Sequence, residues 1–289
     1  MPVKFCPLRT ARRGALLLSV ALLALTTAVS LSAQGSPSKA PPPLRAPKLP
    51  PLPKTPRVPV TFEELFAYRD RRAKAALDYL RCMQSTVTAL RTGELGRVPT
   101  AWSITCIQQG NEWRGVFGEL TDSTPGMRVH LQYAIRGTGA IVRDAIDTAR
   151  VNGTARALLR GLSAPLAHSA TAEFVPIALP QTGYVEVWFI PLPGNPTRVV
   201  IGGDSLIQMS TDGMRELGHS RTTPAVRTLA IEPNGPSYTL QSTEERVPLL
   251  SEFVIAHMAL GLVPEVHIRT YQYDSVITRT SATWTHTRR

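Results

Sequence analysis

A glycine pair followed by an aspartate and a serine is the segment of this chain whose residue types best suit catalysis. Gly202-Gly203-Asp204-Ser205 comes at the end of an apolar stretch, and His219 follows on the return side of the next predicted hairpin. There Asp204 could orient the imidazole of His219 while Ser205 acts as the nucleophile. The same residues also suit an ordinary turn before a strand, and a Gly-x-Ser-x-Gly elbow is not present. We favour the structural turn and keep an exported hydrolase that uses these three side chains as the alternative.

Other catalytic or metal-binding patterns are weak. The sequence contains no HExxH and no CxxC motif, so we expect no metal and no cofactor. Gly137-Thr138-Gly139 lacks the third glycine of a dinucleotide fingerprint, which favours a simple tight turn. His257 lies in an almost wholly apolar stretch and is predicted to be a core histidine with one hydrogen bond. Glu265 and His267, two residues apart, are expected to share one face of a strand.

Cysteine usage favours an oxidising compartment. Cys6 lies before the apolar stretch 14–33, in the part of the chain that is predicted below to be a cleaved export signal. Two cysteines, Cys82 and Cys106, then remain in the mature protein. Such a pair in an exported chain predicts a disulfide, with two buried free thiols as the alternative.

The first 33 residues have the layout of an export signal. Four basic residues (Lys4, Arg9, Arg12 and Arg13) precede an apolar stretch from Gly14 to Ala33. This layout predicts a cleaved signal peptide, with cleavage after Ala33 or, alternatively, Ser30. At ~1.5 Å per residue, residues 14–33 could also just span a ~30 Å hydrocarbon core as an uncleaved anchor. We therefore expect a periplasmic or secreted protein, with a membrane-anchored extracytoplasmic domain as the alternative.

Residues 34–60 form a proline-rich basic linker. Ten of these 27 residues are proline, and five prolines recur at every third position from Pro47 to Pro59. This period matches the three residues per turn of a polyproline II helix, which predicts a stiff spacer. Its basic residues fall on one edge of that helix (Lys39, Arg45, Lys48, Lys54 and Arg57). They could keep a stalk soluble, or could lie along an anionic envelope surface such as cell-wall polymer or lipid headgroups; recognition by a partner's aromatic groove is a third possibility.

The positive charge belongs to the leader and the linker. The chain carries a net charge of +11, of which residues 1–33 contribute four and residues 34–60 five, leaving +2 on residues 61–289. A domain with so small an excess of cations is not expected to bind nucleic acid. The layout of residues 1–60 resembles TonB-type energy transducers, in which an anchor and a proline-lysine stretch precede a compact domain. That resemblance covers residues 1–60 alone, because the C-terminal segment lacks the pattern of the TonB-type domain.

Residues 61–289 predict a globular α+β region. Thr61 and Glu64 form a capping box at the start of an amphipathic helix that runs to about residue 90, and its charged face is interpreted as solvated. Three strands in an antiparallel meander follow at 101–108, 112–120 and 127–136, and helices are expected at 140–150 and 154–162, with a break at Asn152-Gly153. A strand-rich second half then carries one buried helix. The predicted segments are strands at 174–179, 184–190, 197–201, 206–210, 214–217, 227–231 and 238–241, a helix at 247–263, and strands at 265–272 and 276–285.

Segregated helices and antiparallel strands are typical of α+β folds. The region could form one domain or two subdomains, 61–166 and 171–289, with a boundary near residues 164–170. We expect an exported envelope protein with a non-enzymatic binding or scaffolding domain on a stiff basic stalk. Its ligand and its partner protein cannot be identified from these residues.

Overall fold

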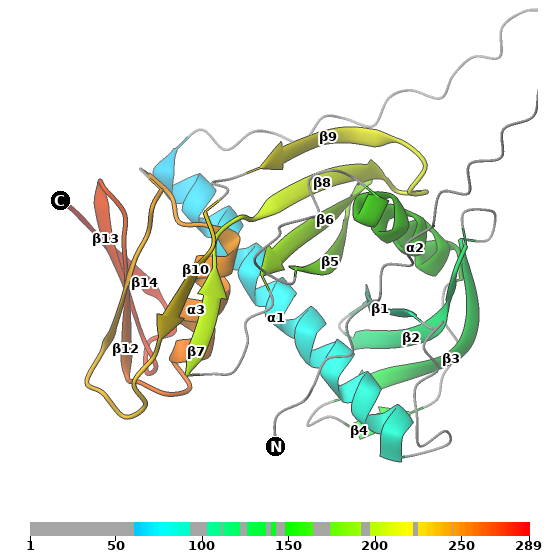
Figure 1. The fold of residues 1–289 in the computed structure, drawn as a ribbon, viewed down its shortest axis with the longest axis horizontal. Helices are drawn as coiled ribbons and strands as arrows, with labels where there is room; N and C mark the ends of the chain where they lie inside the picture. Colours follow the sequence, from blue (N-terminus) through cyan, green and yellow to red (C-terminus); the bar gives the residue numbers. More distant parts are fainter. Residues whose placement is uncertain are drawn as a thin grey trace, which may run out of the picture. The chain divides into compact units, whose positions relative to one another are not determined.

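The computed structural model describes residues 61–92, 103–110, 112–121, 126–136, 140–142, 148–163, 174–191, 197–221, 225–244 and 246–289 of the chain. The predicted leader, the proline-rich linker and the predicted boundary at 164–170 lie outside these residues. The described part is mostly β structure with some helix, in agreement with the broad α+β class (Figure 1).

The first element is α1 (Phe62–Thr92), a helix of 31 residues. It begins at the predicted cap, where the backbone N–H of Glu64 donates to the hydroxyl of Thr61 across 3.1 Å. That bond satisfies one of the N–H groups that a helix leaves unpaired in its first turn. Its buried side chains recur every three or four residues and include polar ones: Phe62, Phe66, Asp70, Ala73, Ala76, Tyr79, Cys82, Thr86 and Leu90.

The first sheet is the predicted meander, extended by one short strand. Its strands β1 (Ser103–Gln109), β2 (Glu112–Leu120), β3 (Met127–Arg136) and β4 (Ala140–Val142) pair in sequence order, each antiparallel to the next. The predicted helix over 140–150 is therefore wrong at its start, because residues 140–142 continue the sheet. The predicted Cys82–Cys106 disulfide is formed, with the two Cα atoms 6.3 Å apart, and it joins α1 to β1.

The second sheet is also antiparallel. Its strands β5 (Phe174–Gln181), β6 (Tyr184–Pro191), β8 (Ser205–Ser210) and β9 (Glu216–Arg221) are arranged in the order β5-β6-β8-β9. Between them in sequence, β7 (Arg198–Ile201) leaves this sheet and pairs with β10 (Arg227–Ala230). All six strands were predicted from apolar stretches and turn residues, with ends that differ by a few residues.

The third sheet contains a parallel pair that the sequence analysis did not foresee. Its order is β11 (Tyr238–Gln241), β12 (Glu265–Arg269), β13 (Tyr273–Thr278) and β14 (Trp284–Arg288). Strands β11 and β12 run parallel, and the helix α3 (Leu250–Ala259) forms the crossover that such a connection needs. The predicted single strand over 276–285 is wrong, because a turn containing Ala282 at a φ of 51° divides it into β13 and β14.

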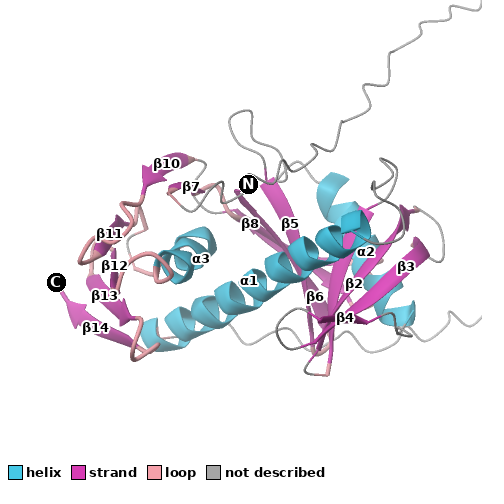
Figure 2. Ribbon diagram, turned by 90° about the horizontal axis from the view of Figure 1, so that it is seen from below, coloured by secondary structure: helices cyan, strands magenta, loops and turns pink. Residues whose placement is uncertain are grey.

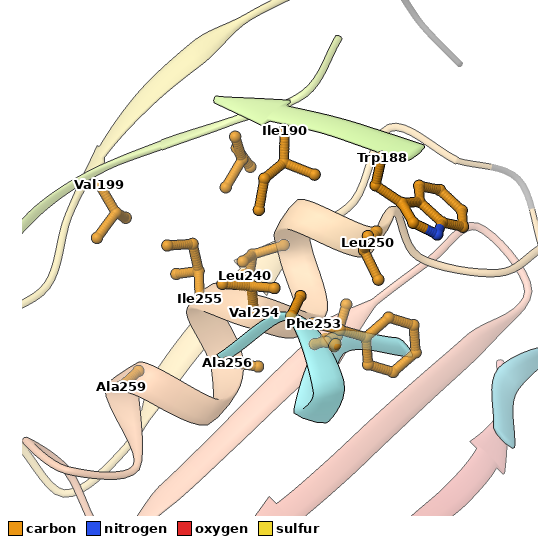
Figure 3. Packing of buried hydrophobic residues seen from close by; sticks show 14 of the residues in the cluster. Trp188, Ile190, Val199, Leu240, Leu250, Phe253, Val254, Ile255, Ala256 and Ala259 are labelled. Atoms are coloured by element: carbon orange, nitrogen blue, oxygen red, sulfur yellow. The ribbon is translucent and has the colours of Figure 1, made fainter. Parts of the chain in front are cut away.

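Helix α3 lies at the centre of the largest apolar cluster. Figure 2 shows it enclosed between α1 and the third sheet, and it also contacts β6 and β7. Figure 3 shows apolar side chains of α3 packed together with apolar side chains of three strands. The strand residues are Trp188 and Ile190 of β6, Val199 of β7 and Leu240 of β11. The helix residues are Leu250, Phe253, Val254, Ile255, Ala256 and Ala259. A buried helix was predicted at 247–263, and α3 lies within that range but is shorter at both ends.

Helix α2 (Thr148–Ser163) is continuous where a break was predicted. The interior glycine has a packing role, since a Cβ on Gly153 would lie 2.2 Å from the carbonyl oxygen of Thr211. The turn between β8 and β9 therefore rests directly on the helix backbone. Two arginines of α2 reinforce this contact by donating to carbonyl oxygens of the turn, Arg156 to Asp212 at 2.7 Å and Arg160 to Met214.

Replacing Gly153 with alanine is expected to destabilise the protein by about 1–3 kcal/mol, although alanine favours a helix more than glycine does. The added methyl group must push the Thr211 backbone away from α2, and that backbone is fixed in a hairpin. Urea unfolding measures the loss. Gly218→Ala in β9 serves as the control, because its Cβ would meet nothing nearer than 3.7 Å. Equal stability of the Gly153 variant and the wild type would contradict the close approach.

Candidate functional site

The turn at Gly202–Ser205, which was predicted to be structural with catalysis as the alternative, is the place where α3 docks on the second sheet. Gly202 and Gly203 have φ values of +92° and +71°, a conformation that favours glycine. The fully buried carboxylate of Asp204 accepts a hydrogen bond from the backbone N–H of Ser251 at 2.8 Å. In return, the N–H of Gly202 donates to the hydroxyl of Ser251 at 3.1 Å. Burial raises the pKa of Asp204 above its usual value, and the hydrogen bonds with Ser251 partly oppose that shift.

The structure places Ser205 and His219 on adjacent strands but not opposite each other. In the β8–β9 register Ser205 faces Arg221, whereas His219 faces Ile207. Such diagonal neighbours have Cα atoms about 7–8 Å apart. The exposed ring of His219 lies 2.6 Å from a carboxylate oxygen of Glu216. The described partners of Asp204 and His219 thus differ, and a hydrolytic role for Asp204, Ser205 and His219 stays a prediction.

A buried carboxylate at the start of α3 was missed by the sequence analysis. Glu252 is fully buried and accepts hydrogen bonds from the Ser242 hydroxyl at 2.6 Å and the Leu249 N–H at 2.9 Å. Its other oxygen lies 3.3 Å from the guanidinium of Arg227. Burial outweighs these contacts and, with a contribution from nearby Asp204, raises the pKa of Glu252 to about 7. Glu252 therefore joins β10 and the segment after β11 to α3.

Glu252 is expected to make the stability of the protein depend on pH near neutrality. Because its pKa is raised in the folded state, its contribution is complete below about pH 4.5 and is lost as the pH rises through about 7. The free energy of unfolding in urea should fall between pH 5 and pH 7.5 in the wild type. In Glu252→Gln this fall should be smaller by about 2–3 kcal/mol. Asp78→Asn, which alters a half-exposed carboxylate, is the control. An unchanged decrease in the Glu252 variant would contradict the assignment.

A second buried carboxylate joins α1 to the middle of the second sheet. Glu186 on β6 is fully buried and lies 2.6 Å from the guanidinium of Arg72. It also accepts hydrogen bonds from Tyr68 at 2.8 Å, from the indole of Trp188 at 3.0 Å and from Tyr184 at 3.3 Å. Burial, followed by the charge of Glu186, raises the pKa of the Tyr68 hydroxyl. The network holds two residues of α1 against β6.

Asp70 joins α1 to α3 and β14. One of its oxygens lies 2.7 Å from His257 Nε2 and accepts from the indole of Trp284 at 2.8 Å, while the other lies 2.8 Å from the amine of Lys74. Burial alone would raise the pKa of Asp70, but hydrogen bonds from these three groups lower it to about 2. The expectation that His257 is a core histidine with a hydrogen-bond partner agrees with this contact.

The sequence contained a signal for each buried carboxylate. Asp70 continues the spacing of the apolar stripe of α1, and Glu186 and Glu252 each interrupt an apolar segment. The interpretation of the α1 charged face as solvated is wrong for Asp70 and for Arg72, whose side chain is only 16% exposed.

Glu265 and His267 were expected to share one face of a strand. On β12, His267 lies 2.7 Å from Glu265 on the same strand face, and it also lies 3.3 Å from Asp274.

We call Asp70, Arg72, Glu186, Asp204 and Glu252 the buried charge network. Each member is bound to groups on a different element, so that the network connects α1, α3 and the second sheet. In the Arg72–Glu186 pair, removal of one partner would leave the other charge without its counter-charge in the protein interior, which is costly. In the described part of the chain, no three or more His, Cys, Asp or Glu side chains are placed to hold a metal ion.

No protein-family model matches the chain, and comparisons with curated proteins and with solved structures also give no match. None of the helices described in the structure combines the length and the apolar character required to cross a membrane. The functional argument therefore rests on the residues and contacts of this chain.

Proposed function

We propose that this protein is an exported, extracytoplasmic binding or scaffolding protein whose domain is carried on the proline-rich basic linker. The observation that carries the proposal is the disulfide between Cys82 and Cys106, both of which are buried. Disulfides persist in oxidising compartments outside the cytoplasm. The basic and apolar segments of residues 1–33 agree with such a location.

A non-enzymatic role is supported by the way the charged groups of the domain are used. Asp70, Glu186 and Glu252 are bound to side chains of neighbouring elements, where they fix the position of α1 and α3. The candidate catalytic Asp204 likewise contacts α3. Such a domain is suited to present a rigid surface at the end of a linker.

The linker supplies the proposed contact with the envelope. Its five basic residues are not accompanied by any acidic residue between positions 34 and 60. A strip of this kind attracts anionic polymers or lipid headgroups, and the attraction is screened over about 8–10 Å at physiological salt. Binding through the linker should therefore weaken as the salt concentration rises.

Expression of the full chain in a bacterial host, followed by cell fractionation and intact-mass measurement, tests the location. We expect a soluble extracytoplasmic form whose mass corresponds to a start near Gln34, and which gains two hydrogens on reduction. A full-length form in the membrane fraction would instead favour the anchored alternative. A cytoplasmic form with free thiols would contradict the proposal.

Co-sedimentation with purified cell-wall polymer and with anionic vesicles tests the linker. Replacing its five basic residues with glutamine should abolish salt-sensitive binding. The matched control exchanges lysine for arginine and arginine for lysine at the same positions, which keeps the charge, and this variant should bind like the wild type. Equal binding by the glutamine variant would show that the linker is a spacer only.

A further inference from the structure

Two Asn-Gly pairs occur in the sequence, and the fold holds them in different surroundings. Asn234-Gly235 lies in the loop between β10 and β11, and its asparagine is exposed. Asn152-Gly153 lies inside the continuous helix α2, where Asn152 is half-buried and Gly153 is buried. An asparagine that precedes glycine can lose ammonia without an enzyme, because glycine has no side chain to hinder attack by its backbone nitrogen. The two pairs therefore show within one chain how the fold affects this reaction.

The reaction joins the backbone nitrogen of the glycine to the side-chain carbonyl carbon of the asparagine. The new C–N bond closes a cyclic imide, and the side-chain amide nitrogen leaves as ammonia. Water then opens the ring. Cleavage of the bond that has just formed yields aspartate, whereas cleavage at the main-chain carbonyl yields isoaspartate, which lengthens the backbone by one carbon atom. The steps consume only water, and hydroxide removes the N–H proton of the attacking nitrogen.

The loop leaves the reacting groups of Asn234 and Gly235 accessible. Asn234 has a φ of 64° and directly follows Pro233, which is typical of a type II turn. Its N–H donates to the carbonyl oxygen of Leu262, just after α3, at 3.1 Å. The N–H of Gly235, in contrast, has no hydrogen-bond partner in the part of the chain that the structure describes. The attacking nitrogen is therefore not held by another group.

In α2 the same groups are fixed. Within a continuous helix each N–H donates to the carbonyl four residues earlier, so the nitrogen of Gly153 is bound. The backbone of Thr211 lies against this glycine, where an added Cβ would be 2.2 Å from the carbonyl oxygen. The side-chain oxygen of Asn152 is buried. Ring closure at Asn152 therefore requires a local opening of α2, which ring closure at Asn234 does not.

We propose that Asn234 is a site of spontaneous deamidation, which creates a carboxylate in the loop between β10 and β11. In the folded protein Asn234 should react at least about tenfold faster than Asn152, because a local opening that costs about 1.4 kcal/mol leaves only about a tenth of the molecules reactive at Asn152. The reaction requires neither export nor a binding partner.

Incubation of the full, oxidised chain in isotopically labelled water, followed by peptide mapping with mass spectrometry, tests the site. The peptide that contains Asn234 should take up labelled oxygen at least about tenfold faster than the peptide that contains Asn152. In urea, where both pairs are unfolded, the two rates should become similar. Gly235→Ala is the matched variant, because its Cβ would meet nothing nearer than a carbonyl oxygen at 3.5 Å and the loop is kept. The added methyl group hinders the attacking nitrogen, so labelling of Asn234 should slow in this variant.

Two results would overturn the proposal. The first is labelling of Asn234 in the folded protein that is absent, or no faster than labelling of Asn152, because the loop would then not favour the reaction. The second is an unchanged rate at Asn234 in Gly235→Ala, because the nitrogen of residue 235 would then not be the attacking group.

Discussion

Replacing Glu186 with alanine is expected to lower the free energy of unfolding by about 3–5 kcal/mol, because the change leaves the largely buried guanidinium of Arg72 without its carboxylate. The indole N–H of Trp188 and the hydroxyl of Tyr68 lose their acceptor at the same time. A buried donor left without a partner costs about 1–3 kcal/mol. Urea unfolding of the oxidised protein, followed by tryptophan fluorescence and by circular dichroism, measures the loss.

Two further variants separate the charge from the loss of volume. Adding Arg72→Met to Glu186→Ala removes the unpaired cation, so the double variant should be more stable than the Glu186 variant alone. Tyr184→Phe removes only the 3.3 Å contact and should cost about 0.5–1.5 kcal/mol. A loss of less than about 1 kcal/mol in Glu186→Ala would mean that the network contributes little to stability.

Local patterns along the chain predicted most of the elements correctly. The start of α1 followed from the Thr61–Glu64 spacing, and the first three strands followed from alternating side chains and turn residues. These features depend on interactions between residues close in sequence, which a single chain reveals. The disulfide between Cys82 and Cys106 was predictable because these are the two cysteines that remain when Cys6, in the predicted leader, is excluded.

The errors arose where contacts between distant segments decide the structure. Gly153 was predicted to end a helix, but its missing side chain admits the Thr211 carbonyl, which lies 58 positions later in the sequence. Asp70 was assigned to a solvated face, but its partners His257 and Trp284 come from the last 40 residues of the chain. Propensity and periodicity contain no information about such partners. Polar residues within an apolar pattern are therefore the positions to examine first for long-range networks.

The second large effect is expected from the disulfide. Replacing both Cys82 and Cys106 with alanine should destabilise the protein by about 3 kcal/mol, the value that the chain-entropy model gives for a loop of this length. The sequence separation of the two cysteines is 24 residues, and the bond cross-links side chains of α1 and of the first sheet.

Because the disulfide is buried, the rate at which a reductant reaches it can be measured in the folded and in the unfolded protein. The side chains of Cys82 and Cys106 are 1% and 0% exposed, so a reductant should reach the bond only when α1 separates from β1. In the presence of a reductant, we expect Cys82 and Cys106 to be alkylated slowly in the folded protein and rapidly in urea. The reduced wild type should unfold at the same urea concentration as the double alanine variant. An identical unfolding midpoint for the oxidised and reduced proteins would contradict a stabilising role. In that case the network around Glu186, rather than the covalent bond, would hold α1 in position.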